Sequence, residues 1–154
     1  MSTHELAQNA FNNINIIKGQ VVNIATADEQ GIPSVAPIGS MRMVDSSTVH
    51  ICQGMLPRTM ANLKKNPKAT FSVYRPPSMW DMLKMLKSDG EDTMGYRAYC
   101  TYTGAATDPK ALEVEVAAIK KRVPFFMRSP LERFFDKIIK QVLVFKIDDI
   151  RAIR

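Results

Sequence analysis

The sequence contains little from which a metal centre or an activated nucleophile could be built. Among its 154 residues are only two cysteines, Cys52 and Cys100, and only two histidines, His4 and His50. The cysteines lie far apart and form no C-x-x-C pair, so we expect two reduced thiols and neither a zinc site nor a disulfide framework. Cys52 follows His50 by two positions in one predicted strand, where a structural role is the simpler interpretation. We therefore expect no metal and assign no catalytic residue.

Long apolar runs are also missing. The longest are short, such as residues 123–127, whereas a helix that spans a bilayer needs about 20 apolar residues. Residues 1–5 do not form a basic segment followed by an apolar run, so no secretory signal is indicated. Together with reduced thiols, this predicts a cytoplasmic protein without a membrane span. The sequence also has no Walker motif and no G-x-G-x-x-G, the two commonest phosphate-binding loops.

The composition is that of an ordinary globular chain, with 45% hydrophobic and 23% charged residues. The length predicts a single domain over residues 1–154. The net charge of +6 is unevenly spread, because residues 110–140 carry eight basic and four acidic side chains. Such a segment can attract nucleic acid, anionic lipid or a phosphorylated ligand, although a solvated helical face is the simpler interpretation.

Hydrophobic periodicity predicts six strands and several helices. Residues 3–18 follow helical spacing, and Ser2 and Glu5 before them fit a capping box. The strands are expected at residues 21–27, 34–44, 48–52, 68–75, 96–106 and 141–147. The first three are joined by short turns and therefore predict an antiparallel meander. Asp148 and Asp149 are expected to close the last strand.

The remaining segments predict helices outside the strands. A short helix is expected at residues 58–65, and another over residues 108–122, where Asp108 is the N-cap. Ser129 fits a second capping box, which opens an apolar helical stripe. Residues 78–95 are ambiguous, with a short methionine-rich helix followed by an exposed loop. The whole predicts an α+β domain built on an antiparallel sheet or small barrel.

The segment from Gln53 to Asn62 is the first candidate site. A strand ends there, a loop containing Gly54 follows, and a helix begins with Arg58 and Thr59. A helix N-terminus exposes unpaired N–H groups and partial positive charge, so an added guanidinium and hydroxyl suit a phosphate. The alternative is that Thr59 only caps the helix.

A second candidate is the strand segment from Val35 to Ser40. Pro37 and Gly39 weaken the strand, so another group could approach this backbone closely. The exposed N–H and C=O groups would suit the edge of a flat heteroaromatic ring. A plain bulge is the alternative. The ten methionines, several of them near these segments, either pack against such a ring or fill the core.

These segments together resemble the FMN-binding split barrel of the pyridoxamine 5′-phosphate oxidase-like superfamily. The resemblance rests on Val21 to Ala27, on Gly31 to Ser40, and on Arg58 to Ala69 with its Arg-Thr, Asn-Leu and Asn-Pro pairs. It covers residues 20–75 well, and residues 96–107 and 141–153 more loosely.

The resemblance implies a six-stranded antiparallel split β-barrel with flanking helices, assembled as a homodimer with two FMN sites at the subunit interface. It implies that Arg58 and Thr59 hold the phosphate and that Asn62 braces their loop or faces the site. It also implies that the flavin and its ribityl chain are bordered by Pro37, Ile38, Gly39, Ser40, Gln53 and Gly54.

The chain departs from the family in two respects. It lacks the extended arginine and lysine signature of true pyridoxamine phosphate oxidases, and it carries an insert at 76–95 and a helical segment at 108–140 outside the minimal barrel. These segments are expected to cover the flavin, shape substrate access or dock a partner. The same superfamily includes haem-binding proteins and deazaflavin (F420)-dependent reductases, and fold alone does not choose among them.

The resulting prediction is an FMN-binding flavoprotein of oxidoreductase type that transfers electrons or hydride through the flavin. Its donor, acceptor and substrate are not named by the sequence. The alternatives are a haem or F420 member of the same superfamily, with His50 or His4 as a haem ligand, or a non-redox binding module that uses residues 110–140. No nucleic-acid partner is expected, because no base-stacking or groove-reading motif is present.

Overall fold

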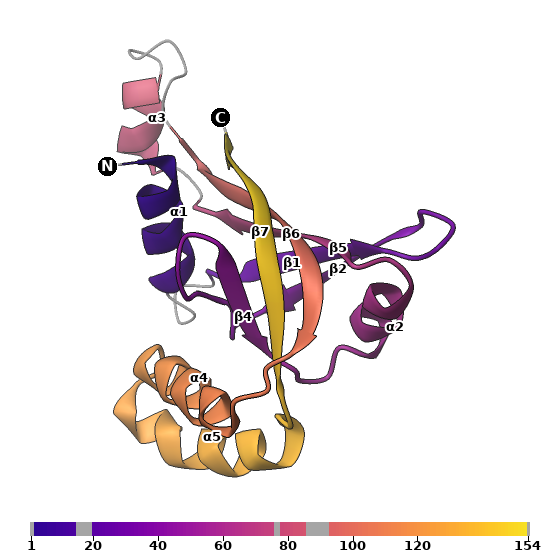
Figure 1. Cartoon of the computed structure of the whole chain (residues 1–154). Coiled ribbons are helices and arrows are strands. Elements are labelled where there is room, and N and C mark those ends of the chain that lie inside the picture. Colours follow the sequence, from indigo (N-terminus) through magenta and orange to yellow (C-terminus); the bar gives the residue numbers. More distant parts are fainter. Residues whose placement is uncertain (1, 15–19, 76–77, 86–92, 154) are drawn as a thin grey trace.

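The protein is built on one strongly curled antiparallel sheet (Figure 1). The computed structural model describes residues 2–14, 20–75, 78–85 and 93–153. In this part of the chain, seven strands follow the spatial order β2-β1-β5-β6-β7-β4-β3, and every pair is antiparallel. This architecture is consistent with a split barrel.

The strands are β1 Val22–Ala27, β2 Pro33–Ile38, β3 Arg42–Met43, β4 Thr48–Cys52, β5 Lys68–Tyr74, β6 Gly95–Ala105 and β7 Val142–Ile153. The helices are α1 Thr3–Asn12, α2 Pro57–Lys65, α3 Met79–Met85, α4 Pro109–Lys121 and α5 Phe125–Ile138. In Figure 1, α4 and α5 lie beyond one end of the sheet, where β6 leaves it and β7 enters it. No helix in the described ranges has the length and apolarity to cross a bilayer.

The core lies on the inner face of the curled sheet. Strand β1 alternates buried and half-buried residues, as a strand with one covered face does. Phe71 of β5 and Phe145 of β7 meet edge to face, with ring centroids 5.1 Å apart, and both are fully buried. Helix α1 closes this core with Ala7 and Phe11.

The hairpin between β1 and β2 forms as predicted. Gly31 adopts φ +81°, a conformation that a residue with a Cβ rarely takes. Oδ1 of Asp28 accepts hydrogen bonds from the backbone N–H groups of Gln30 and Ile32.

The strand predicted at 34–44 is two strands, which makes the count seven rather than six. β2 pairs with β1, whereas β3 pairs with β4 at the opposite edge of the sheet, so the predicted three-strand meander is wrong. The chain leaves the sheet at residues 39–41 because side chains there replace ladder hydrogen bonds. Oγ of Ser40 bonds both the backbone N–H and the C=O of Cys52, and the carbonyl of Gly39 accepts from Arg122.

Two predicted helix boundaries are also wrong. Helix α1 keeps its Ser2–Glu5 capping box but ends at Asn12, and residues 15–18 of the prediction lie outside the described ranges. At this end the Asn12 side chain bonds both backbone groups of Met43, and Asn13 is the C-cap residue. Helix α5 begins at Phe125 rather than at the Ser129 cap, because the extended Pro124 ends the turn after α4 and leaves the next residue free to start a helix.

The other predicted helices are found close to their expected places. Helix α2 covers the predicted 58–65, α4 starts behind the Asp108 cap, and α3 accounts for the first half of 78–95. The loop predicted at 88–92 lies outside the described ranges. Asp148 and Asp149 do not end β7, which runs on to Ile153. A register shift places Asp148 as an extra residue against β6, where Thr101 and Lys68 bond its carboxylate.

Candidate functional site

Five of the predicted flavin-site residues lie around one apolar cavity of about 470 Å³. They are Pro37, Ile38, Gly39, Ser40 and Gly54. The end of β2 and the loop after β4 therefore come together although they are separated in sequence. A cavity of this size is typical of small-ligand sites, which measure roughly 300–1,000 Å³.

The helical hairpin closes the other side of this cavity. Helices α4 and α5, with the residues that follow each of them, contribute Ile119, Val123, Phe135, Ile138 and Ile139. The loop after β4 adds Met55 and Leu56 beside Gly54. A Cβ added to Gly54 would lie 3.8 Å from Cγ2 of Ile138, so the glycine keeps space open between the loop and α5. The extra helical segment thus lines the cavity itself.

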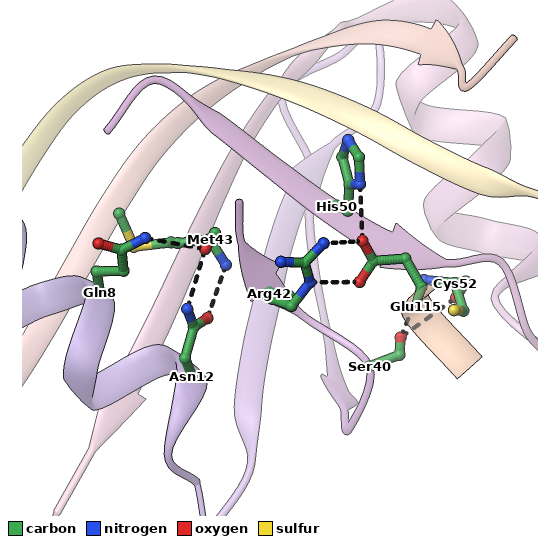
Figure 2. Close-up of polar contacts among 8 residues, drawn as sticks. All are labelled: Gln8, Asn12, Ser40, Arg42, Met43, His50, Cys52 and Glu115. Atoms are coloured by element: carbon green, nitrogen blue, oxygen red, sulfur yellow. Dashed lines mark hydrogen bonds and ion pairs between the residues drawn. The ribbon is translucent and has the colours of Figure 1, made fainter. Parts of the chain in front are cut away.

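The part of the cavity wall formed by residues 37–40 is held by hydrogen bonds from two directions. The Ser40 hydroxyl bonds the Cys52 backbone, which ties the wall to β4 (Figure 2). Nη1 of Arg122 donates to the Gly39 carbonyl over 3.0 Å, which ties the same wall to the end of α4. The segment is therefore an ordered break in the strand, held by side chains from two directions.

Gln53 stands beside the cavity rather than in its wall. Its side chain bonds the side chain of Gln141, and its backbone N–H donates to the Gln141 carbonyl over 2.9 Å. These contacts join the end of β4 to the start of β7.

The predicted phosphate residues lie on α2, and none of them lines the apolar cavity. Arg58 is exposed, whereas Thr59 is only 3% exposed. Asn62 is buried and donates from Nδ2 to Oγ1 of Thr26 over 3.0 Å, which braces the helix against β1. Thr59 does not cap the helix as its N-cap residue, because that position is Leu56.

The start of α2 offers free backbone donors. The N-cap residue, Leu56, supplies no side-chain hydrogen bond, and Pro57 at the first helical position has no N–H. The first intrahelical bond runs from the N–H of Met60 to the carbonyl of Leu56. The N–H groups of Arg58 and Thr59 therefore precede the hydrogen-bonded turns of the helix, at its positive end.

A buried ionic cluster that the sequence analysis missed lies next to the cavity. Glu115 of α4 is 1% exposed and bonds both Arg42 of β3 and His50 of β4 (Figure 2). One signal could have revealed it. Glu115 stands four residues before the buried Ile119, on the inward face of the helix. An acidic residue on such a face needs a charged partner.

The pKa of Glu115 is set by opposing effects. Burial alone would raise it, but hydrogen bonds from Arg42 and His50, with the attraction of their charges, bring it below its ordinary value. The pKa of Arg42 is raised, chiefly by its hydrogen bond to Glu115. Glu115 and Arg42 therefore form a stable ion pair between helix and sheet.

Cys52 has the properties of a structural thiol. It lines the cavity but is almost fully buried, and burial, with the charge of Glu115, raises its pKa to about 12. His50 bonds Glu115 through Nδ1, so it serves the ionic cluster. Within the described ranges, no group of three or more His, Cys, Asp or Glu is placed to hold a metal ion.

Several solved structures share this fold. An FMN-binding protein from Syntrophomonas wolfei subsp. wolfei is similar with a TM-score of 0.67 and 22% identity, covering 99% of this chain and 86% of that one. HutZ, the haem storage protein from Vibrio cholerae, is similar with a TM-score of 0.55 and 13% identity, covering 92% and 89%. An F420 reductase is similar with a TM-score of 0.57 and 13% identity, covering 93% and 94%.

At these identities the likeness shows the fold alone, and the similar proteins differ in the group that their names mention. No curated protein matches the sequence. A family model does match, over residues 13–153, and it describes pyridoxamine 5′-phosphate oxidase. The chain belongs to the pyridoxamine 5′-phosphate oxidase family.

Proposed function

We propose that the protein is an FMN-binding flavoprotein of oxidoreductase type. The observation that carries this proposal is the 470 Å³ apolar cavity whose wall contains Pro37 to Ser40 and Gly54. These are residues that the family resemblance places beside a flavin. When bound, FMN would supply the electron or hydride transfer.

The cavity suits a flat, largely apolar ring. Aliphatic side chains and Phe135 of the helical hairpin face the strand segment across it. Gly39 and Gly54 line the cavity with backbone, because neither has a side chain. Backbone N–H groups that face a bound ring stabilise negative charge on it.

A phosphate would bind at the start of α2. Gly54, Met55 and Leu56 line the cavity and lead directly into this helix. The free N–H groups of Arg58 and Thr59, the helix dipole and the exposed guanidinium of Arg58 favour an anion there. Asn62 holds the helix to β1 through Thr26. The loop of residues 53–56 thus connects the proposed ring-binding cavity to the proposed phosphate site at the start of α2.

The proposal includes a homodimer, as the family resemblance implies. Its test is the mass of the protein in solution, measured by light scattering after gel filtration. A monomeric mass with FMN bound would remove the dimer from the proposal and leave the cofactor in place.

The first experiment is the visible spectrum of the purified protein, with the released chromophore identified by its mass. A two-band flavin spectrum that yields FMN supports the proposal. A colourless protein that also fails to bind added FMN contradicts it, and a Soret band points to haem instead. Among the described residues that line the cavity there is no histidine.

The second experiment is titration of FMN into the variant Arg58→Ala. Removal of a charge-assisted hydrogen bond costs about 1.5–3 kcal/mol, so the affinity should fall by roughly ten- to a hundredfold. Lys110→Ala is the control, because Lys110 is exposed and lies on α4 outside the cavity wall. Unchanged affinity in Arg58→Ala would remove the phosphate assignment.

A further inference from the structure

A second cavity, of about 910 Å³, lies beside Arg122, Val123 and Pro124, at the end of α4. It is bounded by the end of α1, by Arg42 of β3 and by the outer part of α4. Val123 lines both cavities, so the two adjoin there. The second cavity contains none of the residues predicted for FMN.

Its lining is positively charged. Arg42, Lys121 and Arg122 line it, and no carboxylate does so among the described residues. Glu115 lies behind Arg42 and engages Nε and Nη2 of that guanidinium. The same carboxylate also bonds His50. One acidic group is therefore shared by several cationic or ionisable neighbours.

Arg122 has no carboxylate partner of its own among the described residues. It is half-buried, and its hydrogen bond goes to a neutral acceptor, the Gly39 carbonyl, at 3.0 Å. It forms no ion pair with any residue in the described ranges. Burial lowers the pKa of Arg122, attraction to Glu115 opposes this, and repulsion from Arg42 adds to it. An anion in the cavity would relieve this repulsion.

The rest of the lining is apolar or neutral. Helix α4 contributes Val114 and two alanines, and the segment at the end of α1 contributes Ile14 with the amides of Asn12 and Asn13. A cavity with a cationic end and an apolar wall fits a ligand with both characters. A guanidinium binds carboxylate and phosphate oxygens through two parallel hydrogen bonds.

We propose that this second cavity binds a small organic anion, a carboxylate or phosphate carried on an apolar body. Arg122 and Lys121 bind the anionic group, and the α4 wall contacts the body. The inference does not require FMN. Arg122 bonds Gly39, which lines the apolar cavity. If FMN occupies the apolar cavity, an anion bound by Arg122 would therefore lie next to the flavin site, where a substrate is expected.

The test is calorimetric titration of phenyl phosphate and benzoate at constant ionic strength, with benzyl alcohol as the neutral analogue. At least one anion is expected to bind saturably, and benzyl alcohol is not. Inorganic phosphate is titrated in parallel to tell a site for the anionic group alone from one that also uses the apolar wall. Binding by neither organic anion overturns the proposal.

The variants Arg122→Gln and Lys121→Gln should each weaken the binding anion by about tenfold or more. Lys121 is exposed, so its variant is expected to fold even if loss of the Gly39 contact disturbs Arg122→Gln. Lys110→Gln is the matched control on the same helix. Unchanged affinity in Lys121→Gln and in a folded Arg122→Gln overturns the assignment.

The same titrations separate this site from the FMN site. Arg58→Ala is expected to keep anion binding, and Lys121→Gln is expected to keep FMN binding. If the anion instead competes with FMN and is weakened by Arg58→Ala, it binds at α2 and this proposal is wrong. If FMN does not bind but the anion still requires Lys121, the flavin proposal fails and this one stands.

Discussion

Glu115 and Arg42 form a two-pronged ion pair although 73 positions separate them in the chain. Nε of Arg42 donates to Oε2 over 2.8 Å, and Nη2 donates to Oε1 over 2.5 Å. The pair fastens α4 to the edge strand β3. Helix α4 also supplies part of the wall of the apolar cavity, so this contact joins that wall to the sheet.

We expect Glu115→Gln to destabilise the protein strongly. The substitution removes the negative charge of Glu115 but leaves its partners Arg42 and His50 in place. Breaking a buried ion pair by removing one partner costs about 3–5 kcal/mol. The free energy of unfolding, measured by urea denaturation, is the readout. Glu113→Gln is the matched control, because Glu113 is exposed on the same helix. If Glu115→Gln lowers the free energy of unfolding no more than Glu113→Gln does, the ion pair makes no net contribution to stability.

The same pair gives a pH dependence with a definite sign. The pKa of Glu115 is lowered from its ordinary value of 4.5 on folding. Its contribution is therefore fully present above about pH 4.5 and is lost as the pH falls through the lower, folded value. Arg42, His50, Arg122 and the thiol of Cys52 are the charged or ionisable groups near it among the described residues.

The measurement is the free energy of unfolding of the native chain and of Glu115→Gln between pH 6 and pH 3. The difference between them should shrink as the pH falls. Comparison of the two chains removes the contributions of Asp45, Asp148 and Asp149, whose pKa values are also lowered. A difference that stays constant over this range would contradict the assignment.

The hydrogen bond from Asn62 to Thr26 should be measurable by itself. Both side chains are buried, so Asn62→Ala leaves the Thr26 hydroxyl without its donor, at a cost of about 1–3 kcal/mol. Thr26→Val and the double variant complete a thermodynamic cycle. We expect the double variant to be more stable than the sum of the single losses predicts. Simple additivity would show that the two groups do not interact.

Local sequence signals predicted those parts of the structure that local interactions determine. The Ser2–Glu5 capping box, the Asp28–Gly31 turn and the Asp108 cap each satisfy backbone groups within a few residues, and all three are present. The strand signal over residues 21–27 predicted β1, which runs from Val22 to Ala27. Such features need no knowledge of the rest of the fold.

The wrong predictions concern places where contacts with residues far along the chain determine the local structure. Pro37 and Gly39 indicated a weak point in the strand at 34–44, but the groups that hold the break, Arg122 and the Cys52 backbone, lie outside the segment. The contact of Asn12 with Met43 at the end of α1 also joins residues far apart in the chain. The predicted flavin segments do meet at a cavity, but its helical wall and the Glu115 cluster come from residues far along the chain.

The size of the residue at position 54 should control flavin binding. Gly54 lines the apolar cavity, and an added Cβ would stand in ordinary contact with Ile138. Gly54→Ala is therefore expected to fold and to bind FMN within a few-fold of the native affinity. Gly54→Leu extends further into the cavity and should displace the ring, with a loss of FMN affinity of tenfold or more.

Two measurements make this prediction decisive. FMN titration followed by flavin fluorescence gives the affinity, and the melting temperature without FMN reports whether each variant is folded. A folded Gly54→Leu variant that binds FMN as tightly as Gly54→Ala would place the flavin elsewhere. A loss confined to Gly54→Leu would mean that the ring occupies the space between the loop after β4 and α5. The helical hairpin would then form part of the cofactor site in this chain, in addition to the strand segments that carry the family resemblance.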